Sequence, residues 1–535
     1  PLVCTDVMLK GGTEALGSDE LSVLSSVSVG NGLAAVAMYD FVDIEEFCQA
    51  NISYIDNLFT TLLGEDKING LASAMDGSTS NQFWSVQGLI NTGNIKNLPK
   101  VGLYVTLAVA YVALAGPGLY FFWKQRGMRR YYQLSVGILS LCCTGMVLLM
   151  GMSTRFTGPF FTYATIKDTD RDEISETTFI NMRAPYNKPY SVTLNPEYTL
   201  YPITGSAYYN MGPLPKFTGE ETPSITIHYD EEGTKVRSDN VGAFNSKFFM
   251  MERRMENGQQ EGFTGDVNSF DGKVTGTLTN NYGQEVDNVA ILLYNQMILI
   301  GHMEPGETVS LDGMKVIYGI TNFGYAMAEQ ITGASRYKED KDIRDAAYVQ
   351  ALERTNLLSF YMGNYLSGYH SEARVLGFSN EKEETGFLKS PNYETYGSTL
   401  LTSSIDVNYE QDGMIYKSAL QKQPNVLSGE YYASNNSMYG LTPVMLEYYL
   451  GNDIEVEKLS FHQMSDEVVQ SMRYYYTVPF AGNMYFYNYN IGTYDSMDTH
   501  VQSYDREALE PYLSPGNTLT IKYVYDATGD YTWNI

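Results

Sequence analysis

Two uninterrupted apolar runs dominate the pattern of hydrophobic and polar positions along this chain. They cover residues 101–123 and 134–152, and neither run contains an acidic or a basic residue. Each is close to the roughly 20 residues that an α-helix needs to cross a hydrocarbon core about 30 Å thick. The pattern therefore predicts a transmembrane helical hairpin over residues 100–152.

The segment that joins the two runs, residues 124–130, is basic. It contains no acid and four bases, namely Lys124, Arg126, Arg129 and Arg130. Short loops rich in lysine and arginine remain on the cytoplasmic side of a membrane. We therefore expect a protein of the cell membrane whose 124–130 loop is cytoplasmic and whose N- and C-terminal regions are extracellular. Because no signal peptide is visible before the first run, we also expect sequence upstream of Pro1.

Residues 1–99 combine one strand pattern with two helix patterns. A continuous apolar run at 33–39 predicts a buried strand, and acidic residues at 43–46 suit the first turn of a helix. Apolar residues between 55 and 63 recur at helical spacing. One strand and a few helices cannot close a sheet, so we expect a partial, exported α/β domain that continues upstream.

Beyond the second apolar run the pattern changes to short alternations of apolar and polar residues, separated by Gly, Pro, Asn and Asp. The alternation is clearest over 272–311 and predicts a β-sandwich-like extracellular domain over 153–330. Apolar residues at helical spacing predict a helical insert over 331–370, and strand patterns predict a second β-rich extracellular domain over 371–535. The predicted fold class is mainly β, with antiparallel β-sandwich regions, a two-helix transmembrane hairpin and a partial α/β N-terminal domain.

Composition narrows the choice of partners. The net charge is −27, from 62 acidic and 35 basic residues, whereas a nucleic-acid-binding protein needs a basic face, so we expect no nucleic acid as partner. The 45 tyrosines favour β-structure, because tyrosine packs well on a pleated, half-buried surface. The alternative is a surface on which sugar rings stack. Its candidate residues are Tyr474, Tyr475, Tyr476, Tyr485, Tyr487 and Tyr489.

Motifs for catalysis and cofactor binding are missing from the sequence. It has no Gly-x-Ser-x-Gly elbow, no phosphate-binding Gly-x-x-x-x-Gly-Lys loop and no His-Glu-x-x-His pair, so we assign no catalytic residue and no cofactor. The one candidate metal site is Asp168, Asp170 and Asp172, whose spacing resembles the opening of a calcium-binding loop. Glu173 stands where that loop needs glycine and Phe179 where it needs a bidentate acid, which favours a solvated cluster of charges.

Four segments resemble a group of large membrane-anchored surface proteins of Gram-positive, clostridia-type bacteria. They are residues 153–160 directly after the second apolar run, 183–190, 301–308 and 509–515. The similarity extends from about Gly30 to the C-terminus. It implies further exported β and α/β domains upstream. It also implies, for members encoded beside ABC transporters, an auxiliary role with an exported α/β domain similar to the glutamine-amidotransferase class. The resemblance carries no catalytic motif.

Three functional hypotheses follow. The leading one is a non-catalytic, membrane-tethered extracellular surface or auxiliary protein that binds partner proteins of a cell-envelope or transporter complex, with the lipid bilayer as its other partner. The alternative is binding of a glycan or cell-wall polysaccharide by the tyrosine-rich β-domain. The third is an extracellular hydrolase whose two carboxylates meet only in the fold. An enzyme is the less favoured class.

Overall fold

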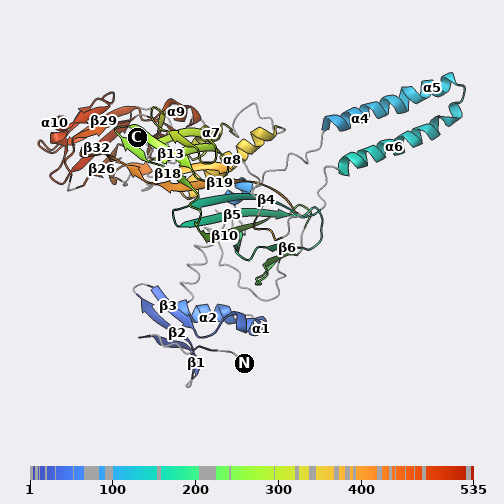
Figure 1. The fold of residues 1–535 in the computed structure, drawn as a ribbon, viewed down its shortest axis with the longest axis horizontal. Helices are drawn as coiled ribbons and strands as arrows, with labels where there is room; N and C mark the ends of the chain where they lie inside the picture. The colour runs from blue at the N-terminus through green and yellow to red at the C-terminus, as the bar shows by residue number, and fades with distance from the viewer. Residues whose placement is uncertain are drawn as a thin grey trace.

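The structure is a computed structural model in which a β-rich body, a long helical hairpin and a small N-terminal unit can be distinguished (Figure 1). This arrangement of antiparallel sheets, two long apolar helices and an N-terminal α/β region confirms the predicted fold class. The structure describes residues 4–5, 10, 12–18, 21–29, 32–51, 53–64, 84–90, 101–152, 158–203, 224–239, 242–293, 296–319, 324–335, 345–366, 373–379, 386–389, 393–417, 424–432, 436–439, 442–451, 454–462, 464–472, 477–525 and 532–534.

A nine-stranded sheet forms the centre of the body, with the order β17-β15-β14-β18-β19-β4-β5-β10-β7. All neighbours are antiparallel except β19 and β4, which run parallel. Its strands are β4 (Phe160–Thr169), β5 (Glu173–Arg183), β7 (Thr199–Ile203), β10 (Lys247–Glu256), β14 (Val286–Leu293), β15 (Gln296–Met303), β17 (Val316–Tyr318), β18 (Ala373–Ser379) and β19 (Glu394–Ile405).

The parallel pair unites strands that are far apart in the sequence, and a glycine permits their close approach. A Cβ atom at Gly397 of β19 would lie 2.1 Å from the carbonyl oxygen of Tyr163 in β4. The pairing joins ranges that the sequence pattern assigns to two separate β-domains, 153–330 and 371–535, into one sheet. Alternation of residue types along a strand is local, and it carries no information on which distant strand becomes the neighbour.

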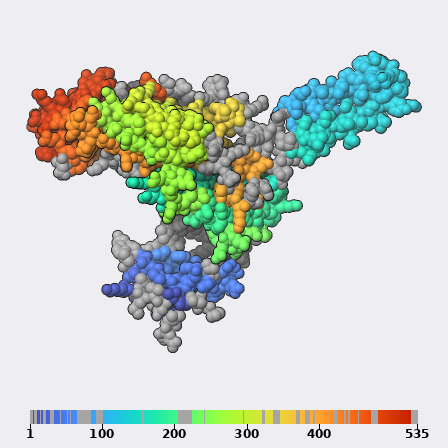
Figure 2. Space-filling view, in the orientation of Figure 1, coloured from blue at the N-terminus to red at the C-terminus, as the bar shows by residue number. Residues whose placement is uncertain are grey.

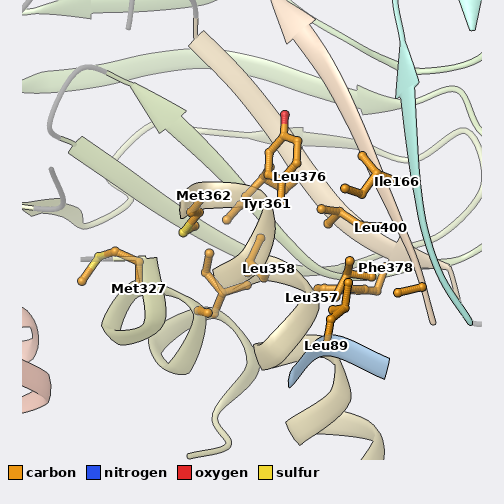
Figure 3. Packing of buried hydrophobic residues seen from close by; sticks show 14 of the residues in the cluster. Leu89, Ile166, Met327, Leu357, Leu358, Tyr361, Met362, Leu376, Phe378 and Leu400 are labelled. Carbon is orange, nitrogen blue, oxygen red and sulfur yellow. The ribbon is translucent and has the colours of Figure 1, made fainter. Parts of the chain in front are cut away.

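Helices cover one face of the nine-stranded sheet. They are α7 (Gly324–Thr332), α8 (Ala346–Asn364) and a helix at 84–90. Figure 3 shows Leu357, Leu358 and Tyr361 of α8 packed towards the sheet residues Leu376 and Leu400. Asp345 begins α8, because its carboxylate accepts a hydrogen bond from the N–H of Ala347. The helix at 84–90 falls within the range 1–99 predicted as a domain of its own, yet its residues join this core.

Two smaller sheets cover the opposite face. A five-stranded sheet consists of β11 (Phe263–Thr264), β13 (Lys273–Asn280), β12 (Val267–Phe270), β20 (Val407–Asn408) and β16 (Thr308–Ser310). A three-stranded sheet consists of β6 (Tyr190–Leu194), β9 (Thr234–Ser238) and β8 (Ile225–His228). Successive residues of the central strands therefore point to different cores, as Leu400 does to the helices and Leu401 to the five-stranded sheet.

The C-terminal part is a β-sandwich with its own core, which includes Leu446, Phe486 and Ile521. Its five-stranded sheet has the order β23 (Asn425–Ser428), β26 (Val444–Tyr449), β32 (Thr518–Tyr525), β29 (Gly482–Asn488) and β30 (Thr493–Met497). Its four-stranded sheet has the order β24 (Glu430–Tyr432), β25 (Ser437–Tyr439), β33 (Thr532–Asn534) and β28 (Thr477–Pro479). Shorter elements complete this part: β27 (Lys458–Ser460), α9 (Asp466–Met472), β31 (Ser503–Asp505) and α10 (Arg506–Leu509).

The N-terminal unit is a three-stranded antiparallel sheet with two helices. The strands are β1 (Thr13–Ser18), β2 (Leu21–Val29) and β3 (Gly32–Ala37), and the helices are α1 (Glu45–Ala50) and α2 (Tyr54–Leu63). The strand predicted at 33–39 forms as β3 and ends at Ala37, but the prediction that it is buried holds only for the end of the run. Leu33 is 37% exposed, whereas Met38 and Tyr39, directly after the strand, are 3% and 8% exposed.

The hairpin extends away from the β-rich body (Figures 1 and 2). Its first arm contains α4 (Val101–Ala113), the π-helical turn Leu114–Gly118 and α5 (Leu119–Gln125), and its second arm is α6 (Tyr132–Met152). The two helical segments, Val101–Gln125 and Arg129–Met152, are long and apolar enough to cross a membrane. Their side chains are largely exposed, so the hairpin offers water an apolar surface that a bilayer would cover.

A hydrogen bond between the two arms compensates for the proline in the first arm. Pro117 has no N–H, and the helix widens around it, so that the N–H of Leu119 bonds to the carbonyls of Gly116 and Leu114. The carbonyl of Ala115, which Leu119 would serve in a regular α-helix, accepts from the hydroxyl of Tyr132 at 2.9 Å instead. Backbone groups inside a bilayer need such partners, because no water is available there.

Candidate functional site

The outer face of the five-stranded C-terminal sheet carries a cluster of tyrosines. Along β29, Met484 and Phe486 point into the sandwich core, whereas Tyr485 and Tyr487 lie on the opposite face. Tyr489 follows directly after the strand at the same spacing of two. The alternation places these three rings on one side of the sheet because successive side chains of a strand point to opposite faces.

Neighbouring strands complete this cluster. In the strand register, Tyr494 of β30 lies opposite Tyr487, and Lys522 of β32 lies opposite Tyr485. Met445 of β26 lies opposite Lys522. We call these side chains the tyrosine face, which comprises Tyr485, Tyr487, Tyr489, Tyr494, Lys522 and Met445.

The rings of the tyrosine face contact one another edge to face. The centroid of Tyr487 lies 5.0 Å from that of Tyr489 and 5.2 Å from that of Tyr494, with interplanar angles of 84° and 69°. Edge-to-face contact is the favoured geometry for aromatic pairs. The rings consequently do not lie in one plane, so they form an irregular surface rather than a flat one on which a sheet of sugar rings could stack.

Polar groups of the tyrosine face are partly satisfied within it. The hydroxyl of Tyr494 donates to the sulfur of Met445 at 3.2 Å, and the hydroxyl oxygens of Tyr489 and Thr520 are 3.1 Å apart. Burial raises the pKa of Tyr494, and so do the neighbouring Tyr487 and Tyr489, so its hydroxyl remains protonated at neutral pH and able to donate.

Lys522 supplies the positive charge of the face. Its ammonium nitrogen lies 5.9 Å from the ring centroid of Tyr485 and 5.5 Å from that of Tyr494, within the range of cation–π attraction. Among the residues that the structure describes, no acid forms an ion pair with Lys522. The cluster therefore offers aromatic surface, hydroxyl donors and an ammonium group.

The predicted glycan-stacking residues are thus only partly located. The structure brings Tyr485, Tyr487 and Tyr489 together, whereas Tyr474, Tyr475 and Tyr476 lie outside the described residues. Sequence reasoning missed Tyr494 and Lys522. Their strands alternate apolar and polar residues visibly, but the register that sets them beside β29 depends on pairing between segments.

The candidate calcium residues lie at the end of β4, which contains Asp168, and in the turn that leads to β5, which contains Asp170 and Asp172. Asp168 accepts from Arg374 at 2.5 Å, and the carboxylate of Asp170 accepts from the hydroxyl of Ser404 at 2.8 Å. Asp172 contributes its backbone carbonyl to the N–H of Asn257. Within the part of the chain that is described, no three His, Cys, Asp or Glu side chains gather as a metal-binding group.

A second polar cluster, which sequence reasoning missed, surrounds His302 on β15. Its Nδ1 lies 2.7 Å from Oδ1 of Asp287, and its Nε2 lies 3.3 Å from Oε1 of Glu304. Nη1 of Arg354 donates to Oδ1 of Asn288 at 2.8 Å and lies 3.4 Å from the second oxygen of Asp287. We call these five residues the His302 cluster. Hydrogen bonds to the two carboxylates raise the pKa of His302.

A bulge in β14 assembles the His302 cluster. The pairing of β14 with β15 shifts register between Val286 and Val289, and Asn288 adopts a positive φ of 54°. The extra residue brings the side chains of both Asp287 and Asn288 within reach of Arg354. No local sequence signal marks a bulge of this kind, because it has no glycine at the strained position.

The comparisons with known proteins identify one domain. Residues 262–408 match the family described as "Domain of unknown function (DUF8725)", a range that contains the His302 cluster, α8 and the five-stranded sheet of the body. No curated protein matches the chain. The solved structures include the yeast delta-COP-I mu-homology domain complexed with Dsl1 WxWxV peptide. This match has 8% identity and a TM-score of 0.24, and it covers 47% of this chain and 98% of that one.

Proposed function

We propose that the protein is a membrane-anchored surface protein whose body lies outside the cell and binds partner proteins of a cell-envelope or transporter complex. The tyrosine face is the observation that carries the proposal. Tyrosine and methionine are enriched in protein–protein interfaces, and tyrosine is among the residues that contribute most to binding energy. The exposed apolar side chains of the hairpin support the proposal that it anchors the protein in a membrane, because exposure of so much apolar surface to water is unfavourable.

Crosslinking from the tyrosine face tests partner binding. A photo-crosslinking amino acid at position 487 in the full chain, expressed in its native membrane, is expected to capture a defined protein. The same amino acid at Tyr201, which is 42% exposed on a different sheet, is the matched control. Capture of the same protein from both positions, or of none from position 487, would refute the tyrosine face as the binding surface.

Site-directed labelling tests the orientation. In a variant without the four native cysteines, a cysteine replaces the exposed Gln411 at the end of β21 (Glu410–Gln411), which pairs with β22 (Met414–Ile415). In a second variant a cysteine replaces Gln125 at the hairpin tip. A membrane-impermeant maleimide added to intact cells is expected to label position 411 and to spare position 125. Labelling of position 125 alone would reverse the topology.

Binding of a polysaccharide is the second candidate, favoured by the ammonium of Lys522 between the rings of Tyr485 and Tyr494. A sugar ring can pack on one tyrosine while its hydroxyls or carboxylates bond to the lysine. Because the rings are not coplanar, a single flexible chain fits better than a flat crystalline surface. A glycan array probed with the detergent-solubilised full chain, beside Lys522→Met, should then show binding by the first and not the second. Absence of any glycan response would leave the partner protein as the ligand.

A further inference from the structure

The tip of the hairpin concentrates positive charge in a segment that has no acid. Lys124, Arg126, Arg129 and Arg130 are all exposed, and no Asp or Glu occurs anywhere between residues 101 and 152. None of the four forms an ion pair within the part of the chain that the structure describes. The tip lies at the far end of the hairpin from the β-rich body (Figure 1), so the acidic residues of the body do not neutralise it.

Aromatic side chains hold two of these bases in place. The guanidinium of Arg126 lies 4.5 Å from the ring centroid of Phe122, and that of Arg130 lies 4.8 Å from the ring of Tyr131. A hydrogen bond connects the two arms next to the tip, where Nε1 of Trp123 in the first arm donates to the hydroxyl of Ser135 in the second at 2.8 Å. Tryptophan and tyrosine prefer the boundary between hydrocarbon and headgroups.

The order of residues along each arm sets the depth of the charges. On both arms of the hairpin, going towards the tip, the apolar helix is followed by aromatic side chains and then by the bases. If the aromatic side chains lie at the hydrocarbon boundary, the bases lie level with the phosphates of the adjacent leaflet. The guanidinium groups of the three arginines suit phosphate oxygens, which arginine can bind through two parallel hydrogen bonds.

We propose that the hairpin tip binds the headgroups of anionic phospholipids, such as phosphatidylglycerol, in preference to zwitterionic ones. This inference rests on the membrane insertion assumed in the proposed function. Attraction to anionic headgroups is confined to the basic tip, because the chain as a whole has a net charge of −27 and would be repelled by an anionic surface. The tip is therefore the part of the chain at which acidic lipids are expected to accumulate.

Trp123 offers a direct readout, because the chain has only three tryptophans. The test uses the full chain with Trp84→Phe and Trp533→Phe, reconstituted into bilayers. Quenching of the Trp123 fluorescence is compared between phosphatidylglycerol and phosphatidylcholine that carry bromine on their acyl chains. We expect phosphatidylglycerol to bind next to Trp123 at least about fivefold more strongly, the effect of one base at an anionic surface.

Two further variants separate charge from hydrogen-bond geometry. Replacement of the four bases by glutamine is expected to remove the preference, whereas replacement of the three arginines by lysine is expected to retain part of it. Equal quenching by both lipids in the parent protein, or a preference that survives the glutamine replacements, would overturn the proposal while leaving the anchor intact.

Failure of both lipids to quench Trp123 would instead show that the hairpin does not insert, which refutes the anchor itself. Should the tryptophan replacements prevent folding, native mass spectrometry of the unmodified chain supplies a second readout. Retention of phosphatidylglycerol over phosphatidylcholine after extraction from a mixed bilayer supports the proposal, and equal retention contradicts it.

Discussion

At the scale of single residues, the His302 cluster shows how one inserted residue can create an electrostatic unit. The bulge at Asp287 and Asn288 supplies two side chains to Arg354, which is only 9% exposed and also lies over the ring of Phe378. A buried guanidinium needs partners for its hydrogen bonds, since an unpaired buried charge is costly. At the surface, His302 contacts one oxygen of the Asp287 carboxylate, and Arg354 lies near the other oxygen.

The charge state of His302 provides the first prediction. Asp287 and then Glu304 raise the pKa of His302 above its ordinary value, so this contact stabilises the folded protein fully below the unfolded-state pKa. The contribution disappears as the pH rises through the folded-state pKa. We expect Glu304→Gln to move the pKa of His302 down towards 6.5, measured by NMR titration of the five histidines. His302→Gln assigns the signal, and an unchanged pKa in Glu304→Gln would contradict the role of Glu304.

Arg354 gives a second prediction, about stability. Arg354→Met keeps the apolar contact with Phe378 but removes the guanidinium from Asn288 and from Asp287, which retains its contact with His302. We expect the free energy of unfolding to fall by about 2 kcal/mol. Urea denaturation of the solubilised chain, followed by circular dichroism, measures this change. Arg237→Met is the matched control, because the ion pair of Arg237 with Asp239 is 59% exposed on the arginine side and exposed pairs contribute little. Equal losses in both variants would argue against a special role for the buried pair.

At the scale of elements, the first arm of the hairpin contains a π-helical turn, and a hydrogen bond from the second arm satisfies the carbonyl that this turn leaves without a helical partner. That carbonyl belongs to Ala115, and the donor is the hydroxyl of Tyr132. A second contact between the arms joins the hydroxyls of Tyr111 and Ser140 at 3.3 Å. Hydrogen bonds of this kind set how two membrane helices rotate against each other, since apolar packing alone is little different from packing against lipid.

A double-mutant cycle tests this compensation. Tyr132→Phe should destabilise the pairing of the two arms by about 1 kcal/mol, because the carbonyl of Ala115 loses its partner. In a Pro117→Ala background the first arm can form a regular α-helix in which Leu119 serves that carbonyl, so Tyr132→Phe should cost little there. Unfolding of the reconstituted chain by steric trapping measures both effects. Equal costs in the two backgrounds would show that Tyr132 acts independently of the proline.

At the scale of the whole molecule, the C-terminal part is attached to the body through an apolar contact, in which Val468 of α9 enters the helix-side core of the body, and through a polar contact beside it. The ring of His462 stacks on that of Tyr318 with centroids 4.5 Å apart and an angle of 4°. Lys458 pairs with Asp271 at 3.0 Å, and the hydroxyl of Ser465 accepts from the N–H of Tyr318. This polar contact joins β17, the β12–β13 turn and the segment that precedes α9, next to the point where α9 packs on the body.

The attachment is expected to depend on pH, with a sign opposite to that of His302. Burial lowers the pKa of His462 below its ordinary value, and this is the largest effect. The charge of Asp271 raises the pKa and that of Lys458 lowers it, and the net shift is downward. The neutral ring therefore stabilises the contact above the unfolded-state pKa, and the stabilisation is lost as the pH falls through the folded-state pKa. Hydrogen exchange in segment 458–465 should accelerate at pH 5.5 relative to pH 7.5, after correction for the intrinsic rate. His462→Phe should abolish the difference, and persistence of the difference in that variant would implicate another group.

Local sequence patterns predicted many of the helices and strands. They could not predict which strands pair when the partners are far apart in the sequence. The two apolar runs, the strands within 272–311 and the shared face of Tyr485 and Tyr487 follow from periodicity alone. The nine-stranded sheet could not be predicted, because β4 and β19 meet across more than two hundred intervening residues. For the same reason Lys522 could not be assigned to the tyrosine face, and the bulge that builds the His302 cluster has no signature in composition.

The late arrival of β19 has a consequence for biosynthesis. One edge of β4 can pair with β5 soon after synthesis, but the other edge has no partner until residues 394–403 have been translated. At about 5–20 residues per second this interval lasts on the order of ten seconds or more. During that time β4 exposes backbone N–H and C=O groups that have no hydrogen-bonding partner, which favours association with other nascent chains. Cells that produce the protein are therefore expected to shield that strand with a chaperone until β19 has been made.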